Sequence, residues 1–211
     1  MESFLRLITL VKDKFLKKNK LIFFFRIILL VFLTKLLFAD TTDKKNILIN
    51  YVQNIKSFSA NFIQSDGQSI EEGTIYIGKD RIRVDYFNPS KITIVMAQNK
   101  AMYVNHELRE VQYFNPQDSA AGVFINIFKN NFFLDGANID IKNKNILLKK
   151  EGEIDNDKFT LLILFEKKPN ILRKIKLEYN NIYNSVMLSN HNFNAVFDKK
   201  FFTMANPFII N

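Results

Sequence analysis

The stretch that decides the fold runs from residue 57 to residue 89 and reads SFSANFIQSDGQSIEEGTIYIGKDRIRVDYFNP. It contains three short runs, at 57–64, 73–77 and 81–86, in which apolar residues alternate with polar or small ones. Alternation with a period of two places the apolar side chains of a strand on one face of a sheet. A polar link follows the first run, and the turn signal Asn88-Pro89 follows the third. The stretch therefore predicts an antiparallel meander with one apolar face.

The third run shows the clearest alternation in the chain. Ile82, Val84 and Tyr86 occupy every second position, and charged residues fill the positions between them. In the second run, Ile75 and Ile77 share one face in the same way. We expect these five side chains on the concave side of a curved sheet. Such a face either fills an ordinary core or lines a cavity, and the pattern alone leaves both interpretations open.

The rest of the chain is expected to form further short elements. Residues 43–56 carry apolar side chains at helical spacing, which predicts a helix before the meander. Residues 117–133 interrupt the strand pattern and again show helical spacing, which predicts one or two short helices. The remaining strands are expected at 92–96, 102–104, 108–114, 139–141, 146–148, 159–165, 171–179, 183–188 and 191–197. Short strands that turn every eight to twelve residues or so indicate an antiparallel sheet in a single domain.

The first 39 residues have the layout of a secretory signal. Several lysines precede an apolar run from Leu21 to Phe38, and the small residue Ala39 comes just before Asp40. Arg26 and Lys35 interrupt the run, whereas a membrane-spanning helix needs roughly 20 mostly apolar residues. We therefore predict cleavage after Ala39 and a mature domain at residues 40–211, with an uncleaved anchor as the alternative.

Removing this segment changes the charge of the protein. The whole chain has 30 basic and 21 acidic residues, a net charge of +9, but residues 1–39 contain eight of the basic residues and two of the acidic ones. The mature chain keeps 22 basic and 19 acidic residues, a net charge of +3. Because a nucleic-acid-binding domain needs its own basic surface, we expect no nucleic-acid partner.

The residue inventory also argues against an enzyme. The chain contains no cysteine, which excludes disulfides, thiolate metal sites and a lipid-modified cysteine on this chain itself. Its two histidines, His106 and His191, lie in or beside predicted turns, without a neighbouring histidine or serine nucleophile. Zinc binding and nucleophilic catalysis both need convergent groups. We therefore expect no catalytic residues, no metal and no cofactor.

Taken in order, these motifs resemble the periplasmic outer-membrane lipoprotein carrier family (LolA-like). Residues 57–64 resemble the family's first strand, which ends in Phe-x-Gln, and Gly73-Thr74-Ile75-Tyr76 resembles its second. Residues 81–86 followed by Asn88-Pro89 resemble its third strand. The terminal Phe202 to Pro207 resembles the family's closing Phe-x-x-x-x-Pro. The resemblance spans about residues 43–208.

The resemblance implies a mainly β fold with an α lid: an unclosed antiparallel β-barrel, a strongly curved sheet covered by short helices. It also implies a periplasmic, non-enzymatic carrier that holds the acyl chains of lipoproteins. Its partners would be the lipoproteins, an inner-membrane release transporter and an outer-membrane lipoprotein acceptor. We expect a monomer.

The apolar residues expected on the concave face of the sheet and in the second helical segment are the candidates for the functional site. The expected lipid-binding cavity consists of Phe62, Ile75, Ile77, Ile82, Val84, Tyr86, Ile94, Met96, Met102, Val104, Phe124, Ile127 and Phe128. Before the third strand the family usually has an Arg-Pro pair linked to lid movement, whereas this chain has Gly78-Lys79-Asp80. Lys79, Arg81 and Arg83 are therefore the candidates for gating the lid.

Two other functions fit the same sequence. A carrier for a different amphiphile, such as a glycolipid, would share the fold and the cavity. A module that senses lipoproteins or docks to an envelope complex would share the fold but need not hold a lipid.

Overall fold

The computed structural model describes residues 43–117, 119–154, 156–167 and 170–209. The chain divides into two units, residues 1–44 and 45–211, and the sheet lies wholly in the second. The predicted signal segment, 1–39, lies outside the described residues. Within the described part, no helix combines the length and the apolar character that crossing a lipid bilayer requires.

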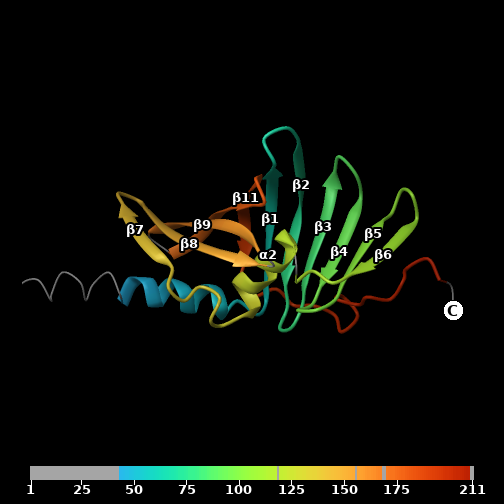
Figure 1. The fold of residues 1–211 in the computed structure, drawn as a ribbon. Coiled ribbons are helices and arrows are strands. Elements are labelled where there is room, and N and C mark those ends of the chain that lie inside the picture. Colours follow the sequence, from blue (N-terminus) through green and yellow to red (C-terminus); the bar gives the residue numbers. More distant parts are fainter. Residues whose placement is uncertain (1–42, 118, 155, 168–169, 210–211) are drawn as a thin grey trace, which may run out of the picture. The chain divides into compact units, whose positions relative to one another are not determined.

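A single antiparallel sheet dominates the second unit (Figure 1). Its strands are β1 (Phe58–Ser65), β2 (Ile70–Ile77), β3 (Ile82–Asn88), β4 (Ile92–Met96), β5 (Ala101–Asn105), β6 (Glu110–Phe114), β7 (Asn138–Lys142), β8 (Asn145–Ile154), β9 (Asp157–Lys167), β10 (Asn170–Tyr179) and β11 (Ile182–Asn192). They are ordered β6-β5-β4-β3-β2-β1-β11-β10-β9-β8-β7, so β6 and β7 are the two edges and the sheet does not close. Residues 43–53 form one short helix, and α2 (Ala120–Lys129) forms the other. The predicted fold class is thus confirmed.

One predicted element is wrong. Residues 191–197 were expected to form a separate strand, but His191 and Asn192 end β11, and residues 193–200 contain no strand. The pairing of β1 with β11 shifts register between Ser59 and Asn61, and Asn190 has a φ of 52°. Such a β-bulge absorbs one extra residue without ending the strand. Ser189 and Asn190, which separate the two expected strands at 183–188 and 191–197, therefore lie within one continuous strand.

Two glycines let aromatic rings lie against the backbone of a neighbouring strand. Gly73 pairs with Phe62, and a Cβ atom at Gly73 would lie 2.5 Å from the Phe62 ring. Gly152 pairs with Phe159, and a Cβ atom there would lie 2.6 Å from that ring. A register shift between Glu72 and Gly73 accompanies the first contact. Glycines in strand interiors mark such close approaches and bends.

The core lies on one face of the sheet, under the two helices. Leu48 and Val52 of the N-terminal helix and Val123 and Ile127 of α2 are buried against residues from both halves of the sheet. A smaller cluster lies elsewhere and consists of Val95, Met102 and Val104, packed against Val111, Phe202, Met204 and Phe208. We call the face that carries this smaller cluster the outer face.

Candidate functional site

A cavity of about 230 Å³ lies between α2 and the sheet. Strands β1 to β4 contribute one side of its lining, and β10 and β11 contribute another. Its lining residues are Phe62, Gln64, Ile75, Val84, Tyr86, Ile94, Met96, Ala120, Ala121, Phe124, Ile127, Ile175, Leu177, Asn184 and Val186. Twelve of these fifteen side chains are apolar, and none carries a formal charge at neutral pH. The cavity therefore suits an apolar ligand.

The structure brings eight of the thirteen predicted cavity residues together in this lining. They are Phe62, Ile75, Val84, Tyr86, Ile94, Met96, Phe124 and Ile127. Their common position follows from the register, because Ile75 pairs with Val84 and Val84 pairs with Ile94 across three adjacent strands. A row of directly opposed residues faces the same side of a sheet. Whether these residues bind lipid remains a prediction.

Three of the other predicted residues lie in the core outside the cavity lining. Ile77 and Ile82 pair with each other at the end of the β2–β3 hairpin, and both are fully buried. Phe128 is buried in α2, where its ring makes an edge contact with Phe124. All three lie in the predicted strands or helical segment and are buried, but they do not line the cavity.

The remaining two predicted residues, Met102 and Val104, lie on the outer face. Ile94 and Met96 of β4 line the cavity, so the residues between and before them, 93 and 95, face away. Val104 pairs with Thr93, and Met102 pairs with Val95. The turn at residues 97–100 thus pairs β4 with β5 so that Met102 and Val104 face away from the cavity, whereas the prediction placed them in its lining. Met102 and Val104 instead belong to the smaller apolar cluster, against which Phe202, Met204 and Phe208 of the C-terminal segment pack.

The sequence prediction missed the part of the lining that comes from the second half of the sheet. Ile175 and Leu177 of β10 and Val186 of β11 face the same cavity as β1 to β4. Their period-two alternation is visible in the sequence and predicts strands, but it does not show that those strands face β2 and β3 across α2.

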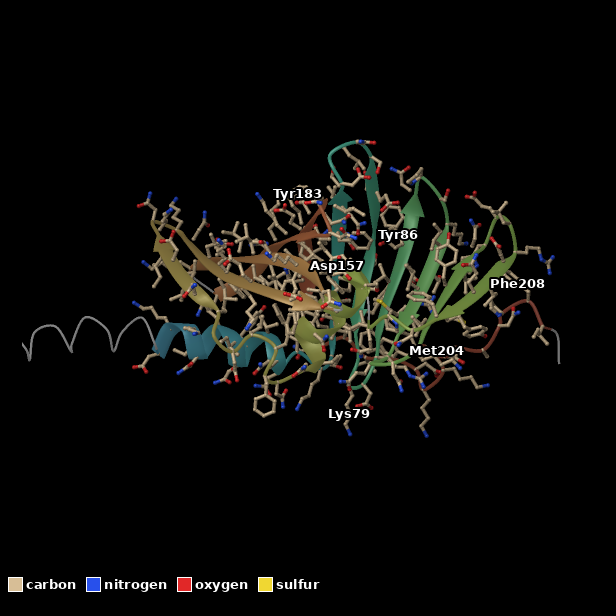
Figure 2. The ribbon with its side chains drawn as sticks, in the orientation of Figure 1. Lys79, Tyr86, Asp157, Tyr183, Met204 and Phe208 are labelled. Carbon is tan, nitrogen blue, oxygen red and sulfur yellow. The ribbon has the colours of Figure 1, made fainter. Side chains whose placement is uncertain are left out.

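One end of the cavity is polar. Tyr86 Oη donates a hydrogen bond to Gln64 Oε1 at 3.2 Å, and Gln64 Nε2 donates to Glu71 Oε2 at 3.1 Å. Asn184 lines the same cavity. Burial, reinforced by the nearby Glu71 carboxylate, raises the pKa of Tyr86 to about 12. The Tyr86 hydroxyl therefore keeps its proton at neutral pH. Figure 2 shows Tyr86 toward the end of the sheet opposite Lys79.

A lysine of α2 contacts the sheet at the other end. Lys129 Nζ donates hydrogen bonds to the Gly78 carbonyl at 2.5 Å and to the Lys79 carbonyl at 3.3 Å, in the turn between β2 and β3. Burial lowers the pKa of Lys129 to about 8, and the Asp80 carboxylate partly offsets this effect. Of the predicted gating residues, Lys79 thus contacts α2 through its backbone, while its side chain is exposed. Lys129 itself was not predicted.

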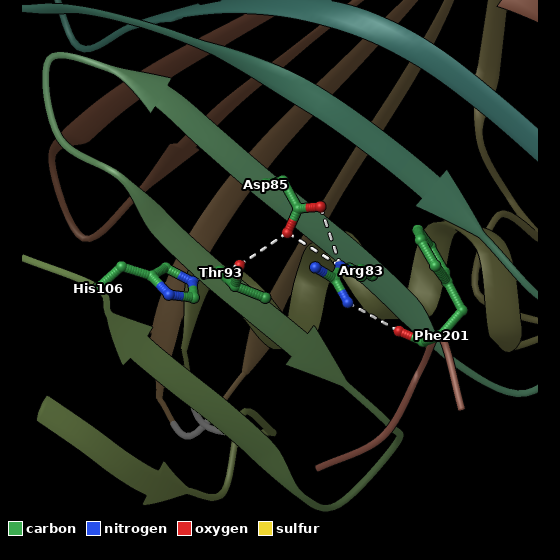
Figure 3. Close-up of polar contacts among 5 residues, drawn as sticks. All are labelled: Arg83, Asp85, Thr93, His106 and Phe201. Atoms are coloured by element: carbon green, nitrogen blue, oxygen red, sulfur yellow. Dashed lines mark hydrogen bonds and ion pairs between the residues drawn. The ribbon is translucent and has the colours of Figure 1, made fainter. Parts of the chain in front are cut away.

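The two predicted gating arginines contact the C-terminal segment. Arg81 Nη1 donates to the Phe202 carbonyl at 2.6 Å, and Arg83 Nη1 donates to the Phe201 carbonyl at 2.9 Å. The Arg83 guanidinium also pairs with Asp85 at 2.9 Å and lies 4.6 Å from the centre of the Phe201 ring (Figure 3). Both arginines therefore hold the C-terminal segment against the outer face.

A hydrogen-bond chain continues from Asp85 across the outer face. Thr93 Oγ1 donates to Asp85 Oδ1 at 2.8 Å, and His106 Nε2 lies 3.0 Å from the same hydroxyl oxygen (Figure 3). Because the only hydroxyl proton of Thr93 is directed at Asp85, its oxygen accepts from His106. In a nucleophilic triad the histidine lies between the nucleophile and the acid. Here the threonine occupies the middle, an order that suits structural support.

Comparisons with known proteins find similar solved structures of low sequence identity. An uncharacterized conserved protein from Thermus thermophilus has 6% identity and a TM-score of 0.49, with 76% of this chain and 91% of that chain covered. MucB has 10% identity and a TM-score of 0.43, with 77% and 62% covered. A DUF1329 family protein from Desulfovibrio piger has 8% identity and a TM-score of 0.44, with 77% and 97% covered. Curated proteins give no match to the sequence.

The family comparison covers most of the chain. The sequence profile described as outer membrane lipoprotein carrier protein LolA matches residues 53–205, which include all eleven strands and α2. The open sheet and the apolar cavity under α2 lie within this matched region. The chain therefore belongs to the LolA family of outer membrane lipoprotein carrier proteins.

Proposed function

We propose that this protein is a periplasmic carrier that shields the acyl chains of lipoproteins released from the inner membrane and delivers them to an outer-membrane acceptor. The apolar cavity under α2 is the observation that carries the proposal, and family membership supports it. In this proposal, residues 1–39 direct export and residues 40–211 form the carrier domain. The carrier acts as a monomer without a cofactor, between a release transporter and an acceptor.

The chemistry of the cavity matches this task. Removing apolar surface from water stabilises a complex by roughly 25 cal/mol per Å², or about 0.8 kcal/mol per methylene. An acyl chain with some fourteen methylenes would gain on the order of 10 kcal/mol before the costs of association are subtracted. Such a chain cannot leave rapidly into water. Release therefore requires an acceptor that offers an equally apolar site.

The small size of the cavity supports a movement of α2 as part of this proposal. Its volume of about 230 Å³ is below the roughly 300–1,000 Å³ of typical sites for small molecules. Ala120, Ala121, Phe124 and Ile127 of α2 form one wall, so displacing this helix enlarges the space. We propose that α2 is the lid and that Lys129 is its latch, because its two bonds to the β2–β3 turn would break when the helix moves.

The experiment that tests the proposal identifies the bound species. The full chain would be expressed in a Gram-negative host, recovered from the periplasmic fraction and analysed by native mass spectrometry. The proposal predicts an N-terminus at Asp40 and a stoichiometric acylated lipoprotein. A glycolipid or another amphiphile in place of the lipoprotein would show that the carrier serves a different cargo. An empty cavity together with a stable complex with an envelope protein would contradict the carrier function.

A further inference from the structure

The polar end of the cavity has a fixed hydrogen-bond order. The Glu71 carboxylate accepts hydrogen bonds and cannot donate them, so the group that Gln64 directs at it is the amide nitrogen. The Gln64 oxygen is then directed toward Tyr86, whose hydroxyl donates its only proton to it. Glu71 thus determines the orientation of both side chains.

This order leaves the Tyr86 oxygen and the Gln64 oxygen as acceptors for a ligand, beside two uncharged donors, the second amide hydrogen of Gln64 and the amide of Asn184. The Tyr86 oxygen has donated its proton, and the Gln64 oxygen has a second lone pair. Behind them lies a carboxylate, one hydrogen bond away from the lining. Among the described residues that line the cavity, none is basic. The electrostatic potential at this end therefore favours groups that donate hydrogen bonds and disfavours negative charge.

The strand register supports the position of Glu71. Gln64 pairs with Glu71, and Phe62 pairs with Gly73, while Ile75 lines the cavity two residues further along β2. Residues 71, 73 and 75 therefore face the cavity side of β2, whereas Glu72 faces the opposite side. The Glu71–Gln64 hydrogen bond agrees with this orientation. Glu72 thus offers a control of equal charge at a neighbouring position.

We propose that Glu71, acting through Gln64 and Tyr86, selects the head group of the ligand at the polar end of the cavity. The site takes acyl chains attached to a hydrogen-bond-donating head, such as a hydroxyl or an amide N–H. It rejects acyl chains whose head is anionic, a carboxylate or a phosphate. The inference rests on the proposed carrier function, because it assumes that an acyl chain occupies the cavity. It adds the class of head group that the protein accepts.

The test compares two ligands with the same chain and different heads. Monododecanoylglycerol is uncharged and has two hydroxyl donors, whereas dodecanoate is anionic at pH 8. Each would displace the neutral dye N-phenyl-1-naphthylamine from the full-length protein at low ionic strength. We expect dodecanoate to bind the wild-type protein at least about tenfold more weakly, as like charges at close range repel.

Two variants assign the effect to Glu71. Glu71→Gln should strengthen dodecanoate binding at least about fivefold and so narrow the difference between the two ligands, because it removes the negative charge and leaves a polar group. Glu72→Gln removes the same charge on the other face and should leave the preference intact. Equal affinity of the wild-type protein for both ligands would overturn the selection by Glu71 and leave the carrier function standing. If Glu71→Gln and Glu72→Gln reduce the preference for monododecanoylglycerol equally, the selection by Glu71 is likewise overturned and the carrier function is unaffected. Failure of both ligands to bind would contradict the carrier function as well.

Discussion

Val84→Glu is the change that best tests whether the cavity holds an apolar ligand. Val84 is 7% exposed and lies between Ile75 and Ile94 on the cavity side of the sheet. A carboxylate introduced there would contact any acyl chain that enters. Since an ionised carboxylate is very costly to bury beside hydrocarbon, ligand binding would require its protonation.

The cost of that protonation can be worked out from the ordinary pKa of glutamate, about 4.3. At pH 7 the neutral form costs about 3.7 kcal/mol, which corresponds to an affinity loss of about 500-fold. At pH 5 the cost falls to about 1 kcal/mol, or about fivefold. The variant should therefore recover about 100-fold in affinity between pH 7 and pH 5.

Dye binding at the two pH values measures this effect. N-phenyl-1-naphthylamine is neutral at both, so only the protein titrates. Val84→Gln serves as a matched variant, since its amide weakens binding without a pH dependence. Ile63→Glu serves as a surface control, because Ile63 is 43% exposed and pairs with the exposed Met187. Unchanged affinity of Val84→Glu at pH 7 would refute the cavity assignment, and an equal loss at both pH values would indicate structural damage.

Three further changes test the lid, the sheet and the outer face. Lys129→Met should speed dye uptake several-fold in stopped-flow measurements, because charge-assisted hydrogen bonds contribute about 1.5–3 kcal/mol and two of them hold α2; equal uptake rates would argue against the latch. The same variant tests a pH effect: the pKa of Lys129 is about 8 in the folded protein and near 10.4 when unfolded, so the unfolded state binds more protons in that window. The free energy of unfolding of the wild-type protein should therefore include a term that rises between pH 8 and pH 10. Urea titrations at several pH values should find this rise in the wild-type protein and not in Lys129→Met. Gly73→Val should lower stability by about 1–3 kcal/mol or more, because its Cβ atom would clash with the Asp85 carbonyl oxygen; a thermal midpoint equal to wild type would show that the strands separate easily there. Met102→Ala should cost about 2–5 kcal/mol in urea unfolding and leave dye affinity unchanged, since Met102 is 3% exposed on the outer face; a large affinity loss would return Met102 to the cavity.

Much of the cavity was predictable because its residues follow local periodicity. The alternation in β2 and β3 correctly indicated that Ile75, Val84 and Tyr86 share one face. Side-chain orientation within one strand depends on the backbone pleat, which the sequence pattern expresses directly. The prediction failed for Met102 and Val104 because the turn between β4 and β5 decides which face an alternating strand presents.

The sequence by itself determined the elements of this protein: a short helix, a meander of alternating strands, a second helix and further strands. Only the tertiary structure decided that β10 and β11 complete the cavity, that Lys129 reaches the β2–β3 turn and that Glu71 orients Gln64 and Tyr86. The physical reason is the range of the interactions. Periodicity and turn chemistry act over a few residues, whereas these contacts depend on how an open sheet curves and on what its helices cover. Those features arise from packing between distant segments, which no local pattern in the chain encodes.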